Sequence, residues 1–146
     1  NVLEFPNAKI HISKRGWIHF HTTHKHPHDG RDTSIPPHIL AELVGKSWDR
    51  VVLLEDEETI APGLRTWWSG GHHRASIAVE VDTKAGTAVL SDTFFVMENV
   101  VNNHPIGITE NMYECMDAHA RALKSPIVIP LYDPKNFDRF KNGVVA

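Results

Sequence analysis

Two short segments of this chain combine residue types that bind metal ions. His72 follows the glycine pair Gly70-Gly71, and Asp92 stands twenty residues later, after the apolar stretch Val89-Leu90. Glycines let the backbone approach a buried ion without side-chain bulk. An imidazole and a carboxylate together suit zinc, manganese or iron. The alternative is that the glycines form a turn, His72 lies at the surface and Asp92 caps a helix.

A histidine-rich run forms the second candidate, in a chain that holds eleven histidines. It extends from His19 to Asp29 and includes His21. Its segment His24-x-His26-x-His28-Asp29 nearly matches the binuclear hydrolase signature His-x-His-x-Asp-His, with the last two residues exchanged. No predicted strand leads into it, although a rigid site needs ligands on framework elements. Three interpretations stay open: a primary metal site, a substrate-access loop walled by Trp17, or a solvated polar loop.

Three further residues accompany these candidates. His73 is adjacent to His72, so one of the two can bind a metal while the other faces substrate or packs. Tyr132 follows the last predicted strand, where active sites of α/β proteins gather. Its hydroxyl can donate a proton, bind substrate or coordinate a metal, and the alternative is a half-buried packing role. Ser76 is expected to brace the loop that carries His72 and His73, called the histidine loop below, through its hydroxyl group.

Hydrophobic periodicity predicts the elements that position these residues. Strands are expected at 8–13, 51–54, 64–68, 76–81, 87–90 and 127–131, and helices at 14–20, 38–46, 110–123 and 134–140. Residues 55–58 are predicted as an acidic turn, and 99–104 as irregular chain or one helical turn. This order of elements favours an α+β or α/β layered fold.

Composition narrows the functional classes. The 146 residues are about one domain in length, so 1–146 is treated as a single unit. The net charge of −3 does not mark a nucleic-acid binder, and no apolar run reaches the roughly 18 residues of a membrane span. The lone Cys115 excludes an internal disulfide, so a cytoplasmic setting is expected.

Several strings together resemble the metallo-β-lactamase superfamily. They are Ile60-Ala-Pro-Gly-Leu-Arg-Thr-Trp-Trp-Ser-Gly-Gly-His72, Ser76-Ile-Ala-Val, Gly86-Thr-Ala-Val-Leu-Ser-Asp92, Pro130-Leu-Tyr-Asp-Pro134 and Phe5-Pro-Asn-Ala8. The likeness is greatest to N-acyl homoserine lactonase-like hydrolases and covers nearly the whole chain. The chain matches roughly the second, C-terminal half of a full family member.

This resemblance implies an αββα four-layer sandwich with a di-metal centre, usually two zinc ions, although manganese or iron is also compatible. It assigns metal binding to His72, and bridging of the two ions to Asp92. Tyr132 stands where the family has its last histidine ligand, and Phe95 where the lactonases carry a tyrosine. With Asp92, Tyr132 is a catalytic candidate, and Trp17, His21, His73 and Phe95 are substrate-binding candidates.

The implied activity is a metal-dependent hydrolase that opens a lactone, cyclic amide or related small carbonyl compound by attack of metal-bound hydroxide. The four-ligand motif His-x-His-x-Asp-His would precede Asn1, so we expect a second polypeptide to carry it, either a separate subunit or a piece of a cleaved precursor. The alternatives are a non-catalytic structural or regulatory subunit and an iron-dependent redox enzyme on the same fold.

Overall fold

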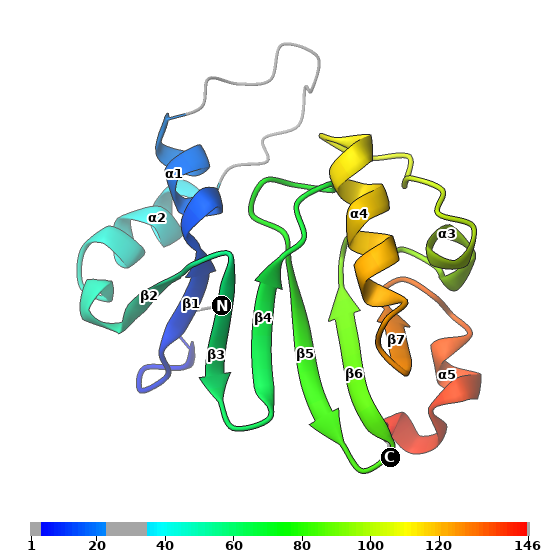
Figure 1. Ribbon diagram of the computed structural model, residues 1–146. Helices are drawn as coiled ribbons and strands as arrows, with labels where there is room; N and C mark the ends of the chain where they lie inside the picture. Colours follow the sequence, from blue (N-terminus) through cyan, green and yellow to red (C-terminus); the bar gives the residue numbers. More distant parts are fainter. Residues whose placement is uncertain (1–3, 23–34, 146) are drawn as a thin grey trace.

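A five-stranded sheet forms the centre of the computed structural model, which describes residues 4–22 and 35–145 (Figure 1). Its strands lie in chain order: β3 (Glu57–Ala61), β4 (Leu64–Trp68), β5 (Ile77–Thr83), β6 (Gly86–Ser91) and β7 (Ile127–Pro130). The pairs from β3 to β6 are antiparallel, whereas β6 and β7 are parallel. The central β5–β6 hairpin and its turn at 83–86 confirm the prediction.

A smaller unit lies beside β3 in Figure 1. It contains the parallel pair β1 (Ile10–Ser13) and β2 (Val51–Leu54) together with α1 (Lys14–Thr22), α2 (Pro37–Val44) and a 3-10 turn (Trp48–Arg50). The hydroxyl group of Ser13 accepts a hydrogen bond from the Gly16 amide at 3.2 Å, as predicted for the residue that caps α1.

Helices cover one face of the five-stranded sheet. They are α3 (Met97–Val101), α4 (Met112–Ala122) and α5 (Asn136–Arg139), with a last 3-10 turn at Lys141–Gly143. The buried core lies between this face and the helices, and it consists of Trp67, Ala78, Val89, Phe94, Val100, Ala118, Ala122 and Val128. The side chain of Asn111 accepts hydrogen bonds from the Tyr113 and Glu114 amides, which fixes the start of α4.

The opposite face of the sheet is also apolar. Successive strand residues point to alternate faces, so the neighbours of the core residues form a second row. The apolar side chains of this uncovered face include Leu64, Ile77, Val79, Val81, Leu90, Ile127 and Ile129, all partly exposed. Within the described residues, no helix or strand covers it as α3 and α4 cover the core face. A sheet that is apolar on both faces is typical of an inner layer.

One local prediction is wrong. Residues 55–58 do not form a turn as a whole, because Glu57 and Glu58 belong to β3, where Glu57 pairs with Trp67 across the ladder. An edge strand with exposed side chains tolerates acidic residues, and Arg121 donates to Glu57 at 2.5 Å. The segment 99–104, predicted as irregular chain or one helical turn, contains the end of α3 followed by irregular chain. None of the helices in the described ranges is long and apolar enough to cross a bilayer.

Candidate metal centre

Three chain segments meet at one edge of the sheet. In the antiparallel β5–β6 pair Val79 lies opposite Leu90, so extending this register by two residues brings Ile77 opposite Asp92. The hydroxyl group of Ser91 donates to the Ile77 carbonyl at 2.9 Å and closes this end. The parallel strand β7 pairs Pro130 with Ser91, which places the chain after β7 at the same edge. The topology therefore gathers the loop before β5, the residue after β6 and the end of β7.

The loop that carries His72 is held against α4 by its glycines. Gly71 has φ +68°, and a Cβ atom there would lie 2.7 Å from the Cα atom of Cys115. The Gly71 amide donates to the Glu114 carboxylate at 3.2 Å, and the Gly71 carbonyl accepts from the Glu110 amide at 2.8 Å. Only glycine fits this close approach. Gly71 therefore serves the contact with α4.

The ring of His72 is oriented by a hydrogen bond to the backbone. Its Nδ1 atom lies 2.8 Å from the carbonyl oxygen of Ile108 and donates to it. This bond places the ring proton on Nδ1 and leaves the Nε2 lone pair available for an ion. The Phe95 ring packs edge-on against the His72 ring at a centroid distance of 5.2 Å. The donor chemistry therefore fits a metal, and the fixing partner is a backbone carbonyl.

Asp92 and His72 line the same cavity, of about 810 Å³. The polar part of its wall also includes His73, Thr109 and Glu110. The apolar part comes from the uncovered sheet face and the chain after β7, with Ile77, Val79, Leu90 and Leu131. In the described part of the chain, His72 and Asp92 do not belong to a tight group of three candidate ligands. Two donors alone leave a metal centre incomplete.

His73 also faces this cavity, in a different setting from His72. Its Nδ1 atom accepts a hydrogen bond from the Ala75 amide at 3.0 Å, and its Nε2 atom lies 3.6 Å from the Glu110 carboxylate. Burial lowers the pKa of His73, the Glu110 charge opposes that shift, and His19 adds to it. The Phe20 ring stacks on the His73 ring at 5.4 Å. The His73 imidazole is therefore held neutral beside a carboxylate.

Tyr132 and Phe95 stand next to the cavity but are not part of its wall. Tyr132 is 60 % exposed, and its ring lies edge-on to Phe95 at 4.8 Å. Its backbone amide donates to the Phe95 carbonyl at 3.1 Å. The aromatic rings of Tyr132, Phe95 and the metal-ligand candidate His72 thus form a continuous row. This row brings together three residues that the sequence singled out.

Trp17 and His21 lie on α1, away from the cavity wall. Their rings are 4.3 Å apart, and the Trp17 ring lies 5.7 Å from that of Trp48. The structure therefore brings Trp17 and His21 together with each other, and not with the lining residues of the cavity. The segment His24–Asp29 of the histidine-rich run lies outside the described residues.

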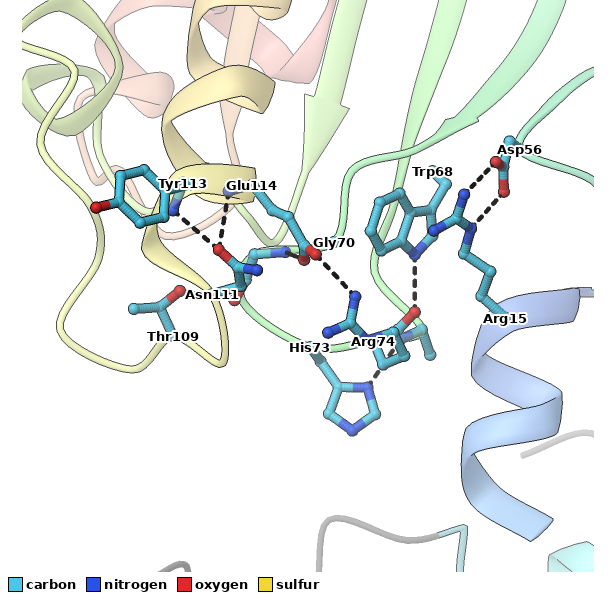
Figure 2. A network of polar contacts seen from close by, with 12 residues as sticks. Arg15, Asp56, Trp68, Gly70, His73, Arg74, Thr109, Asn111, Tyr113 and Glu114 are labelled. Carbon is cyan, nitrogen blue, oxygen red and sulfur yellow. Dashed lines mark hydrogen bonds and ion pairs between the residues drawn. The ribbon is translucent and has the colours of Figure 1, made fainter. Parts of the chain in front are cut away.

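A polar network that the sequence did not reveal holds the histidine loop in place (Figure 2). Arg74 donates to the Glu114 carboxylate at 2.9 Å, and the indole nitrogen of Trp68 donates to the Arg74 carbonyl at 2.8 Å. The Arg15 guanidinium stacks on the Trp68 ring at 4.1 Å and pairs with Asp56. These contacts join α1, the histidine loop and α4. Because the three segments are far apart in the sequence, patterns of neighbouring residues do not reveal the contacts.

The expectation for Ser76 is wrong. Its hydroxyl group is buried and has no hydrogen-bond partner among the described residues. Its backbone carbonyl braces the loop instead, by accepting from the Ser69 and Gly70 amides at 3.1 and 3.2 Å. The glycine turn brings those two amides to the carbonyl, so the bracing role needs no particular side chain.

Comparison with known proteins gives a fold. No protein-family model and no curated protein matches this chain. Solved structures match over 94–96 % of it at 16–17 % identity. One is an N-acyl homoserine lactone hydrolase with N-hexanoyl-L-homoserine at its catalytic metal centre (TM-score 0.73, 52 % of its length), and another a quorum-quenching N-acyl homoserine lactone lactonase (0.70, 53 %). A third is a B. thuringiensis AiiA variant with N-decanoyl-L-homoserine bound. It is 17 % identical to this chain with a TM-score of 0.73, and the match covers 94 % of this chain and 52 % of that one.

These likenesses confirm the predicted α+β architecture. The chain spans about half the length of the solved structures it matches. An uncovered apolar sheet face and a cavity that holds only two of the candidate ligands, His72 and Asp92, are consistent with this partial coverage. This chain has the fold of about one half of an N-acyl homoserine lactone hydrolase.

Proposed function

We propose that this chain is one part of a metal-dependent hydrolase that acts on a lactone, cyclic amide or related carbonyl compound. The hydrogen bond from His72 Nδ1 to the Ile108 carbonyl carries the proposal, because it directs the other ring nitrogen to coordination. Asp92 supplies a carboxylate on the same cavity. Two of the solved structures that share the fold contain an N-acyl-L-homoserine, at the catalytic metal centre in one and at the active site in the other, which supports the substrate class.

In this proposal His72 and Asp92 would be the residues of this chain that hold zinc. When bound, such ions supply Lewis acidity toward a carbonyl group and a water of lowered pKa. The chain's own residues then bind and orient the substrate. Ile77, Leu90 and Leu131 offer an apolar wall to its hydrocarbon part. Phe95 lacks a hydroxyl group, whereas the neighbouring Tyr132, whose ring lies 4.8 Å from that of Phe95, carries one on an exposed side chain.

We propose further that a second polypeptide covers the apolar sheet face and completes the metal centre. A sheet that is apolar on both faces needs a partner layer, as in sandwich folds. The missing ligands would come from a His-x-His-x-Asp-His motif on that polypeptide. An interface that completes a shared core is expected to be apolar and larger than about 2,000 Å². Co-purification from the native source, with sequencing of the second polypeptide, tests this directly.

Metal analysis of the purified assembly tests the hydrolase proposal. We expect His72→Ala and Asp92→Asn each to lower the metal content and to abolish hydrolysis of lactone substrates. His104→Ala removes an exposed histidine outside the cavity wall and serves as the matched control. Unchanged metal content in both cavity variants, with unchanged thermal stability, would contradict the metal role of this pair.

A non-catalytic subunit is the second candidate. The resemblance implies a tyrosine at position 95 and a histidine at position 132, but this chain has Phe95 and Tyr132. The Phe95 ring contacts the rings of both His72 and Tyr132. Retained metal binding together with no hydrolysis of lactones or cyclic amides by the complete assembly would favour this second function.

A further inference from the structure

We propose that His19, His73 and Glu110 form a second binding site, for a divalent transition metal of the zinc class, at the cavity that His73 and Glu110 share with His72 and Asp92. The ligand candidates of the hydrolase proposal, His72 and Asp92, are not members of this group. The inference therefore goes beyond the proposed function and does not depend on it. One donor atom from each of the three residues lies within 4.8 Å of the other two. Within the described ranges, no other group of three such residues is as close.

The three side chains come from three different parts of the fold. His19 belongs to α1, His73 to the loop before β5, and Glu110 precedes α4. Each is only partly exposed, and the side chains of His73 and Glu110 are each 18 % exposed. The Nε2 atom of His73 is buried without a hydrogen-bond partner among the described residues, at 3.6 Å from the Glu110 carboxylate. A bound cation would satisfy both groups.

A close helix–loop contact brings His19 to this place. Gly16 packs directly on Ala75, and a Cβ atom on Gly16 would lie 2.6 Å from the Cα atom of Ala75. Residues three apart lie on the same face of a helix, so His19 follows Gly16 on the face toward the loop. The His19 and His73 rings are nearly perpendicular, with a centroid distance of 5.4 Å. The Phe20 ring stacks on the His73 ring, also at 5.4 Å. The contact at Gly16 thus sets the spacing of the two imidazoles.

The donor set indicates the class of metal. Two imidazoles and one carboxylate bind zinc with an open fourth position, and the same set binds iron(II). Hard cations such as calcium prefer oxygen ligands alone. The Ala75 amide donates to His73 Nδ1, which places the ring proton on Nε2 in the present arrangement. Coordination through Nε2 would therefore move that proton to Nδ1 and release the Ala75 amide.

Cobalt titration tests the site, because Co²⁺ occupies zinc sites and absorbs visible light. The chain, with any polypeptide that co-purifies, is freed of metal and titrated with Co²⁺. We expect His19→Ala and Glu110→Gln to weaken one binding event by on the order of 100-fold or more, since loss of supporting residues alone costs 10–100-fold. His38→Ala removes an exposed histidine of α2 and is expected to leave that event unchanged.

Three outcomes are separable. Loss of one event in His19→Ala, with a second event lost only in His72→Ala, supports two sites. Loss in His19→Ala with no effect of His72→Ala supports this site and contradicts the hydrolase centre. Wild-type Co²⁺ binding in both His19→Ala and Glu110→Gln, or none in the wild-type protein, would overturn the inference. Zinc is also expected to shift the Ala75 amide resonance in NMR spectra of wild type and not of Glu110→Gln, which keeps the shape of the side chain.

Discussion

Replacement of Gly71 by alanine tests how the fold positions His72. The new Cβ atom would lie 2.7 Å from Cys115 Cα, 2.8 Å from Cys115 N and 2.9 Å from Cys115 Cβ. Two of these atoms are helical backbone, which cannot move aside as a flexible side chain can. The loop must therefore shift away from α4, and its hydrogen bonds with Glu114 and Glu110 lengthen. We expect the variant to lose stability and to bind metal at His72 less tightly.

The magnitude follows from two terms. A left-handed conformation costs a residue with a Cβ atom roughly 1–2 kcal/mol, and overpacking adds about 1–3 kcal/mol. Gly63→Ala is the matched control, because Gly63 has φ +75° but its Cβ atom would meet only Asp82, at 3.5 Å. The difference in unfolding free energy between the two variants, measured by urea denaturation, should be about 1–3 kcal/mol. Equal destabilisation of both variants would refute the steric argument.

Three further predictions concern other parts of the fold. Gly16→Ala should weaken Co²⁺ binding at the His19–His73–Glu110 site without removing a ligand, because the helix must move away from Ala75; wild-type affinity in the titration would contradict this. Asp133→Ala should lower the unfolding free energy in urea by about 1–3 kcal/mol, because the buried carboxylate accepts hydrogen bonds from the Met97 and Lys135 amides. Asp138→Ala, at an exposed position of α5, should leave the unfolding free energy unchanged. Burial lowers the pKa of His119, so protonation favours the unfolded chain and the unfolding free energy should fall as the pH drops below about 6.5. His119→Leu should lessen this pH dependence. An unchanged slope of unfolding free energy against pH in the variant would argue against this reasoning.

The regular part of the fold could be predicted because its signals are local. The β5–β6 hairpin combines alternating apolar residues with a glycine in the turn, and α4 carries its own cap at Asn111. β3 could not be predicted in the same way. Its glutamates give no apolar alternation, and it forms because it pairs with β4, whose Trp67 side chain lies in the core. A strand that is defined by its neighbour leaves little trace in its own residues.

The candidate site could be predicted in part. The spacing of His72 and Asp92 around one hairpin predicts that they line one cavity, and they do. The partner of His72 is a backbone carbonyl, that of Ile108, and a carbonyl has no residue-type signal. Glu110 reaches His73 through a loop that is fixed by the Gly71 carbonyl, and His19 arrives from another element. Such contacts depend on tertiary packing, which a single sequence does not display.

The two adjacent histidines face different partners, and this difference separates their roles. The His72 ring is oriented by a carbonyl that accepts its Nδ1 proton, whereas the His73 ring is oriented by an amide that donates to its Nδ1. Opposite hydrogen-bond polarity at the same atom gives the two rings opposite tautomers. His72 therefore offers a lone pair at Nε2 at once, but His73 must first exchange its proton and give up one hydrogen bond. If both bind metal, binding at His73 should require the rearrangement at Ala75, whereas binding at His72 should leave its hydrogen bond with Ile108 intact.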